Sequence, residues 1–142
     1  MPHEALNETV YTSTATAGGG RAGHVRSEDG VVDLPLGKPG STANPKANPE
    51  TLLAAGWAAC FGANLNAIAN KEGLDTSEST VTADVTVGRT DTGFGLAAAI
   101  VAAVPGVDEA KAQELADKAH EVCAYSKATR GNIDVTVTGV PA

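Results

Sequence analysis

Apolar and polar residues alternate along several short stretches of the chain, and such alternation predicts half-buried strands. Residues 80–88 alternate most clearly, because every second residue is Val or Ala and the residues between them are mostly polar. Pro35 predicts that the strand around it ends early or lies at a sheet edge. With the hairpin and turn signals that flank them, five further strands are predicted at residues 8–17, 23–27, 31–36, 96–104 and 133–137.

A long helix is predicted over residues 50–71. Asn48, Pro49 and Glu50 stand in the order of an N-cap, a first helical position and a first-turn carboxylate. The residues that follow are apolar on nearly every helical face, which predicts that this helix is buried on most of its sides.

A second helix is predicted over residues 109–122, capped by Asp108. Its expected core-facing residues are Ala110, Leu115, Ala119 and Val122. Strand runs interrupted by only two helices predict an α+β fold with antiparallel sheets. The length predicts a single domain over residues 1–142. One domain of this size cannot easily cover the first helix, and this predicts an intertwined dimer.

Composition and charge argue against several classes of protein. The chain has 17 acidic and 10 basic residues, a formal charge of −7 and no basic run, which argues against nucleic-acid binding. No apolar stretch approaches the roughly 20 residues of a membrane helix, and the N-terminus lacks the features of a secretory signal. We therefore expect a cytoplasmic protein that binds neither nucleic acid nor a membrane.

Two cysteines, Cys60 and Cys123, are the first candidates for chemistry. They are too few for a disulfide framework, and neither they nor the three histidines have metal-ligand spacing. Two buried thiols or one redox pair remain as alternatives. Taken alone, Cys60 fits a core residue better, because free cysteines are among the most buried residues. Apolar burial also makes a thiol inert unless a cation lies nearby. Cys123, at a helix end, fits a resolving thiol and a packing residue equally well.

Arg21 is the candidate cation for Cys60. Three glycines, residues 18–20, precede it and allow a tight or left-handed backbone that could aim the guanidinium inward. Glu50 could orient Arg21 through a bidentate pair. Taken alone, each has a simpler explanation, as a solvated arginine and as a carboxylate that complements the helix dipole. His120 could act as a general base, although a surface histidine is the better fit.

Four segments, taken together in this order, carry a family resemblance. They are YTSTATAGGGR (11–21), NPE with the run through ACF (48–61), TGFGL (92–96) and VCAYSKATRGNIDV (122–135). Over nearly the whole chain they resemble the organic hydroperoxide resistance (Ohr) branch of the Ohr/OsmC family. The second cysteine followed by Tyr-Ser and Ala-Thr-Arg-Gly-Asn is the most specific of these motifs.

The resemblance implies an OsmC-like α+β homodimer in which antiparallel sheets wrap around central buried helices, with both active sites at the subunit interface. It implies a metal-free and cofactor-free antioxidant peroxidase that reduces organic hydroperoxides in the response to oxidative stress. An external dithiol of the lipoyl type would reset it. By position, Cys60 is the peroxidatic thiol, Cys123 the resolving thiol of a redox-active disulfide, and Arg21 and Glu50 are the polar partners of Cys60.

The chain departs from the family pattern in two places. Ala124 stands where a proline usually follows the second cysteine and stiffens the helix end, and the loop at 37–47 is shorter than usual, which would alter the pocket mouth. A preference for alkyl hydroperoxides is predicted from apolar residues expected near the first thiol: Phe61, Phe94 and Leu96. Two alternatives stay open, a peroxidase of the OsmC branch and a non-catalytic dimer that binds small apolar ligands.

Overall fold

A computed structural model of the chain describes residues 3–40 and 44–142. The expectations about the first two residues and part of the 37–47 loop therefore fall outside the described residues. The chain divides into two compact units, Met1–Leu52 and Leu53–Ala142, which are described separately below. Whether they form one domain stays a prediction.

The first unit contains a small antiparallel sheet in the order β1-β2-β3. Its elements are β1 (Ala15–Gly18), the 3-10 turn η1 (Gly20–Ala22), β2 (His24–Ser27) and β3 (Asp33–Pro35). The edge strand β3 ends at Pro35, as predicted from that residue. The strand expected from residue 8 begins only at Ala15.

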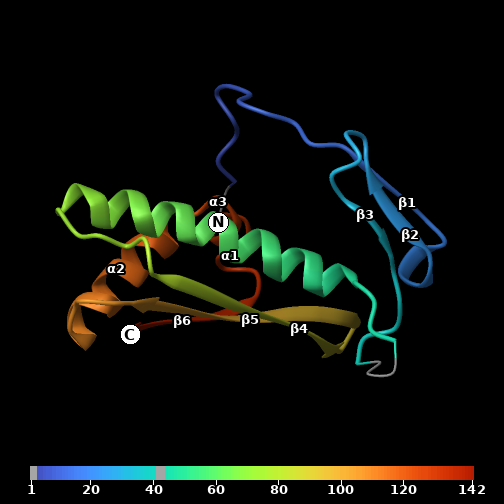
Figure 1. Cartoon of the computed structure of the whole chain (residues 1–142). Coiled ribbons are helices and arrows are strands. Elements are labelled where there is room, and N and C mark those ends of the chain that lie inside the picture. Colours follow the sequence, from blue (N-terminus) through green and yellow to red (C-terminus); the bar gives the residue numbers. More distant parts are fainter. Residues whose placement is uncertain (1–2, 41–43) are drawn as a thin grey trace. The chain divides into compact units, whose positions relative to one another are not determined.

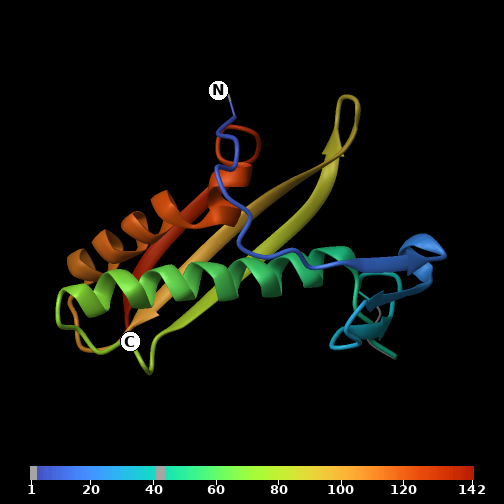
Figure 2. The ribbon, with the colours of Figure 1, turned by 90° about the horizontal axis from the view of Figure 1, so that it is seen from above.

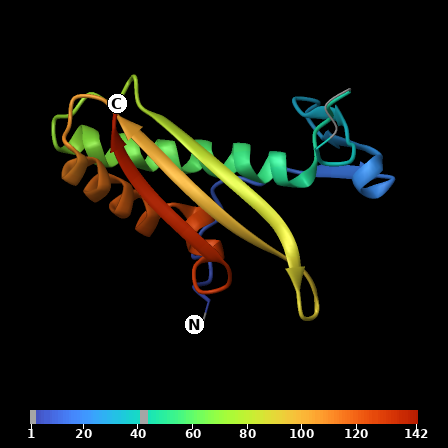
Figure 3. The same ribbon diagram turned by 90° about the horizontal axis from the view of Figure 1, so that it is seen from below.

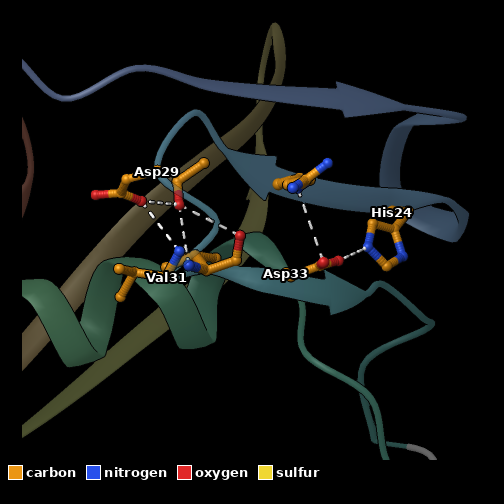
Figure 4. A network of polar contacts seen from close by, with 7 residues as sticks. His24, Asp29, Val31 and Asp33 are labelled. Atoms are coloured by element: carbon orange, nitrogen blue, oxygen red, sulfur yellow. Dashed lines mark hydrogen bonds and ion pairs between the residues drawn. The ribbon is translucent and has the colours of Figure 1, made fainter.

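Side-chain hydrogen bonds close the turn between β2 and β3 (Figure 4). The Asp29 carboxylate accepts hydrogen bonds from the Ser27 hydroxyl at 2.6 Å and from the Val31 backbone N–H at 3.0 Å. The bond from Ser27 is the main reason why the pKa of Asp29 lies below its usual range. Across the sheet, Asp33 pairs with His24.

The second unit contains a sheet in the order β4-β5-β6. Its first element is α1 (Pro49–Lys71), whose residues up to Leu52 belong to the first unit. The others are β4 (Thr80–Thr90), β5 (Gly93–Val104), α2 (Glu109–Val122), α3 (Ala124–Thr129) and β6 (Asp134–Pro141). Strands β4 and β5 form an antiparallel hairpin, whereas β6 runs parallel to β5. The expectation of purely antiparallel sheets is therefore wrong for β6, because α2 and α3 form the crossover that a parallel neighbour needs.

Both predicted helix starts are confirmed. The Asn48 side chain accepts a hydrogen bond from the backbone N–H of Thr51 at 2.8 Å, which caps α1. The Asp108 side chain accepts from the backbone N–H of Lys111 at 2.8 Å, which caps α2.

The core of the second unit lies between the helices and one face of the sheet (Figures 1 and 2). Viewed from below, the other face carries no helix from the described part of this unit (Figure 3). Three elements, α1, β5 and α2, each contribute a row of buried apolar residues. These rows are Trp57, Phe61, Leu65 and Ala69 on α1, Ala98, Ile100, Ala102 and Val104 on β5, and Ala112, Leu115, Ala116 and Ala119 on α2.

Two expectations about these helices are wrong. The core face of α2 runs through Ala112 and Ala116, so Ala110 and Val122 are exposed rather than buried. Within this chain α1 is buried along one face only, and its burial on most sides stays a prediction that depends on the predicted dimer. At 23 residues α1 is also long and apolar enough to cross a membrane by length and composition, contrary to the expectation that no stretch approaches this. Its largest side chains pack against the sheet, as in a core helix.

Candidate active site

Cys60 and Cys123, the thiol pair, meet inside the second unit. Cys60 lies in the middle of α1 and Cys123 at the junction of α2 and α3, and their sulfurs are 3.4 Å apart. Both are free thiols, since the separation exceeds the ~2.05 Å of a disulfide bond. The fold thus brings together two cysteines that are 63 positions apart, which favours the redox pair over two unconnected core thiols.

The backbone holds Cys123 from both sides. Its N–H still donates to the Ala119 carbonyl at 2.9 Å, while its own carbonyl accepts from the Lys127 N–H at 2.9 Å. The residue itself has extended φ and ψ angles, so α2 ends and α3 begins around it. Cys123 is therefore at a helix end, as expected, and the short helix α3 follows it directly.

The two thiols differ in exposure. Cys123 has no exposed surface, whereas Cys60 is half-buried. Burial raises the pKa of the Cys123 thiol. Cys60 is therefore the thiol that a molecule from solution can reach more easily.

Asn64, which the sequence pattern did not single out, lies one helical turn beyond Cys60. Its side-chain Nδ2 donates to the Cys60 carbonyl at 2.9 Å and lies 4.0 Å from the Cys60 sulfur. The four-residue spacing of Cys60 and Asn64 could have indicated this contact, because residues four apart share a helical face.

A polar contact between Trp57 and Ser126 was likewise not predicted from the sequence. The Trp57 indole N–H donates to the Ser126 hydroxyl at 3.1 Å, and both residues are fully buried. A buried tryptophan usually needs such a partner for its N–H. Beside them, Gly56 allows the Tyr125 ring to pack closely on α1, since an added Cβ would lie 3.3 Å from that ring.

Arg21 and Glu50, the ion pair, meet inside the first unit. The guanidinium donates from Nη1 and Nη2 to the two carboxylate oxygens at 2.8 and 2.7 Å, which confirms the bidentate pair. Arg21 lies in η1, where Gly19 and Gly20 both have the positive φ that the glycine run allows. The hydrogen bond from Arg21 lowers the pKa of Glu50 and raises that of Arg21.

The thiol pair belongs to the second unit and the ion pair to the first. Whether Arg21 serves Cys60 therefore stays a prediction. The described residues contain no cluster of three or more His, Cys, Asp or Glu side chains placed to hold a metal ion. Within the second unit, the Phe94 side chain is 72% exposed, and the centroid of its ring lies 5.1 Å from the guanidinium carbon of Arg89. The place of Phe94 in a substrate pocket stays a prediction.

His120 lies in the last turn of α2, with a buried Nδ1 that has no partner among the described residues. Burial lowers the pKa of this imidazole. Its role as a general base stays a prediction.

Comparisons with known proteins agree on one family. Residues 40–138 match the model of the OsmC-like protein family. An organic hydroperoxide resistance protein of Xanthomonas axonopodis pv. citri is 45% identical, over 92% of this chain and 95% of that protein. The crystal structure of the organic hydroperoxide resistance protein OhrB of Bacillus subtilis is 40% identical, with a TM-score of 0.84 over 93% of this chain and 98% of that one. A corresponding structure from Elizabethkingia anophelis is 46% identical, with a TM-score of 0.87 over 95% and 99%.

Proposed function

Because this chain belongs to the Ohr/OsmC family of α+β proteins, we propose that it is a cysteine-based peroxidase that reduces organic hydroperoxides to alcohols. The names of its relatives support the substrate class. The observation that carries the proposal is the contact of two free thiols, one half-buried and one fully buried, at 3.4 Å. This is the geometry expected of the reduced form of a redox-active disulfide.

In the first step the Cys60 thiolate attacks the distal oxygen of the hydroperoxide. The O–O bond breaks, the sulfur keeps the hydroxyl group as a sulfenic acid, and the alkoxide takes up a proton and leaves as the alcohol. Cys60 fits this role because it is the more accessible of the two thiols.

In the second step the Cys123 sulfur attacks the sulfenic sulfur of Cys60. The S–O bond breaks, water leaves after protonation, and the Cys60–Cys123 disulfide forms. An external dithiol of the lipoyl type then attacks this disulfide, passes through a mixed disulfide and leaves as its own cyclic disulfide. One hydroperoxide and one dithiol thus give one alcohol, one water and one oxidised dithiol, without a bound cofactor.

Arg21 supplies the positive charge in this scheme. A guanidinium has five N–H donors, and Glu50 takes two of them while fixing its plane. The remaining donors stabilise the Cys60 thiolate and the charge that develops on the leaving oxygen. Arg21 and Glu50 are therefore proposed as the polar partners of Cys60.

We further propose that the protein acts as a cytoplasmic homodimer. Along α1, four alanines one helical turn apart are exposed in the single chain: Ala55, Ala59, Ala63 and Ala67. Small side chains in such a row let another helix approach closely, and a second copy would cover this apolar face.

The direct test is the consumption of tert-butyl hydroperoxide by the purified protein with dihydrolipoamide as reductant. We expect rapid turnover that the Cys60→Ser variant loses, and a lower kcat/KM for hydrogen peroxide than for cumene hydroperoxide. An absence of turnover, with both thiols still free after treatment with hydroperoxide, would contradict the proposal and favour a non-catalytic binding protein.

A further inference from the structure

Asn64 places a side-chain amide beside the Cys60 sulfur. Both residues lie on α1, four positions apart, and both are half-buried. The side-chain Nδ2 of Asn64 donates to the Cys60 carbonyl at 2.9 Å and lies 4.0 Å from the Cys60 sulfur. Because one helix carries both residues, its backbone alone places the amide and the sulfur on the same face.

The chemistry of these groups fixes which end of the amide faces the sulfur. A backbone carbonyl can only accept a hydrogen bond, so the Asn64 atom that lies 2.9 Å from the Cys60 carbonyl oxygen must be the amide nitrogen. This nitrogen carries two protons, and the carbonyl takes one of them. The second makes at most a weak contact with the sulfur, since 4.0 Å exceeds the length of an ordinary hydrogen bond.

The separation of the amide nitrogen and the sulfur suits a reacting oxygen atom that touches both. Two atoms 4.0 Å apart can each lie about 3 Å from the same third atom. An oxygen about 3 Å from the sulfur is in position for attack by the thiolate. An oxygen about 3 Å from the nitrogen accepts a hydrogen bond of ordinary length. One position therefore meets both requirements.

We propose that Asn64 is a catalytic residue whose amide N–H holds the distal oxygen of the hydroperoxide against the Cys60 sulfur. This inference deepens the proposed function and rests on it. The sulfur gives its electron pair to the distal oxygen, the O–O bond breaks, and the electron pair of that bond leaves with the alkoxide, which takes a proton from solvent. The amide keeps its own proton and ends on the sulfenic oxygen, which is the same atom.

The experiment compares two reactions of one thiol in the full-length Cys123→Ser protein, where Cys60 is the remaining cysteine. Tert-butyl hydroperoxide presents an oxygen to the sulfur, whereas iodoacetamide presents a methylene carbon that cannot accept a hydrogen bond. At one pH, we expect Asn64→Ala to lower the rate constant for the hydroperoxide about tenfold, the scale of one lost hydrogen bond. The rate constant for iodoacetamide should stay unchanged.

Two further variants separate the lost donor from other effects of the substitution. Asn64→Leu keeps the number and branching of the side-chain heavy atoms but has no donor, and it should lower the ratio of the two rate constants as Asn64→Ala does. Asn70→Ala removes an exposed amide from the same helix and should leave both rate constants unchanged. Alanine favours a helix more than asparagine does, so both alanine variants are expected to fold.

The outcomes distinguish this inference from the proposed function. An unchanged rate constant for the hydroperoxide in Asn64→Ala would overturn the inference and leave the function standing. Equal slowing of both reactions would also overturn it, because the amide would then act on the thiol instead of the substrate. If Cys60 reacts with iodoacetamide but with no hydroperoxide even when Asn64 is present, the proposed function is contradicted and the inference falls with it.

Discussion

The thiol pair and the ion pair are built in opposite ways. Cys123 has no exposed surface and is held by the core of the second unit, whereas the Arg21 side chain is 55% exposed on a short turn of the first. Buried contacts are few and strong because water does not compete, while exposed charges are screened. Substitutions around the thiol pair should therefore change both stability and chemistry, and substitutions in the ion pair chiefly chemistry.

The largest effect should come from the core beside the thiols. Phe61→Ala removes a ring with no exposed surface and should lower the free energy of unfolding by about 3–5 kcal/mol. Phe94→Ala is the matched control, since that ring is 72% exposed and its loss should change stability little. Denaturant unfolding measures the free energy of unfolding of both variants. Equal losses would contradict the proposed difference between the buried and the exposed region.

Arg21→Lys tests the other half of the comparison. Lysine keeps the charge but not the planar fork that matches both oxygens of Glu50. We expect kcat/KM for cumene hydroperoxide to fall by about tenfold or more, with the thermal unfolding midpoint close to that of the wild type. Arg26→Lys, at another exposed arginine of the same unit, should leave both quantities unchanged. A wild-type kcat/KM in Arg21→Lys would contradict a role of the planar guanidinium in the mechanism.

The pH dependence of the ion pair should be a smaller effect. Arg21 holds the pKa of Glu50 below its ordinary value of 4.5. A lowered carboxyl pKa in the folded state means that the pair's contribution to stability is complete above pH 4.5 and is lost as the pH falls through the folded-state value. The ¹³C shift of the Glu50 carboxyl should titrate below 4.5 and move toward it in Arg21→Gln. A wild-type titration at or above 4.5 would contradict this.

Local features of the sequence predicted the local features of the fold. Asn48 and Asp108 cap their helices through their own side chains, and the alternation at residues 80–88 corresponds to β4. The parallel pairing of β6 could not be predicted in this way, because strand direction depends on which strand becomes the neighbour. The six-residue α3 was missed for a related reason, since so short a helix is stabilised by its tertiary contacts.

The candidate site also combines contacts that residue chemistry suggests with contacts that depend on tertiary packing. Residue chemistry offered the bidentate contact of Arg21 with Glu50 as one possibility, and the family resemblance favoured placing the two residues in one site, although 29 positions separate them. The proximity of Cys60 and Cys123 could not follow from their spacing, because only the packing of α1 against the α2–α3 junction brings them together. The contact of Ser126 with Trp57 depends on the same packing.

The central claim is that Cys60 and Cys123 form one redox pair. Its most direct test is peptide mapping by mass spectrometry of the reduced protein after treatment with one equivalent of cumene hydroperoxide. The account predicts that both free thiols disappear and that a single disulfide joins residues 60 and 123 of the same chain, with Cys123→Ser stopping at the Cys60 sulfenic acid. Two thiols that remain free, or a disulfide that joins different chains, would contradict it.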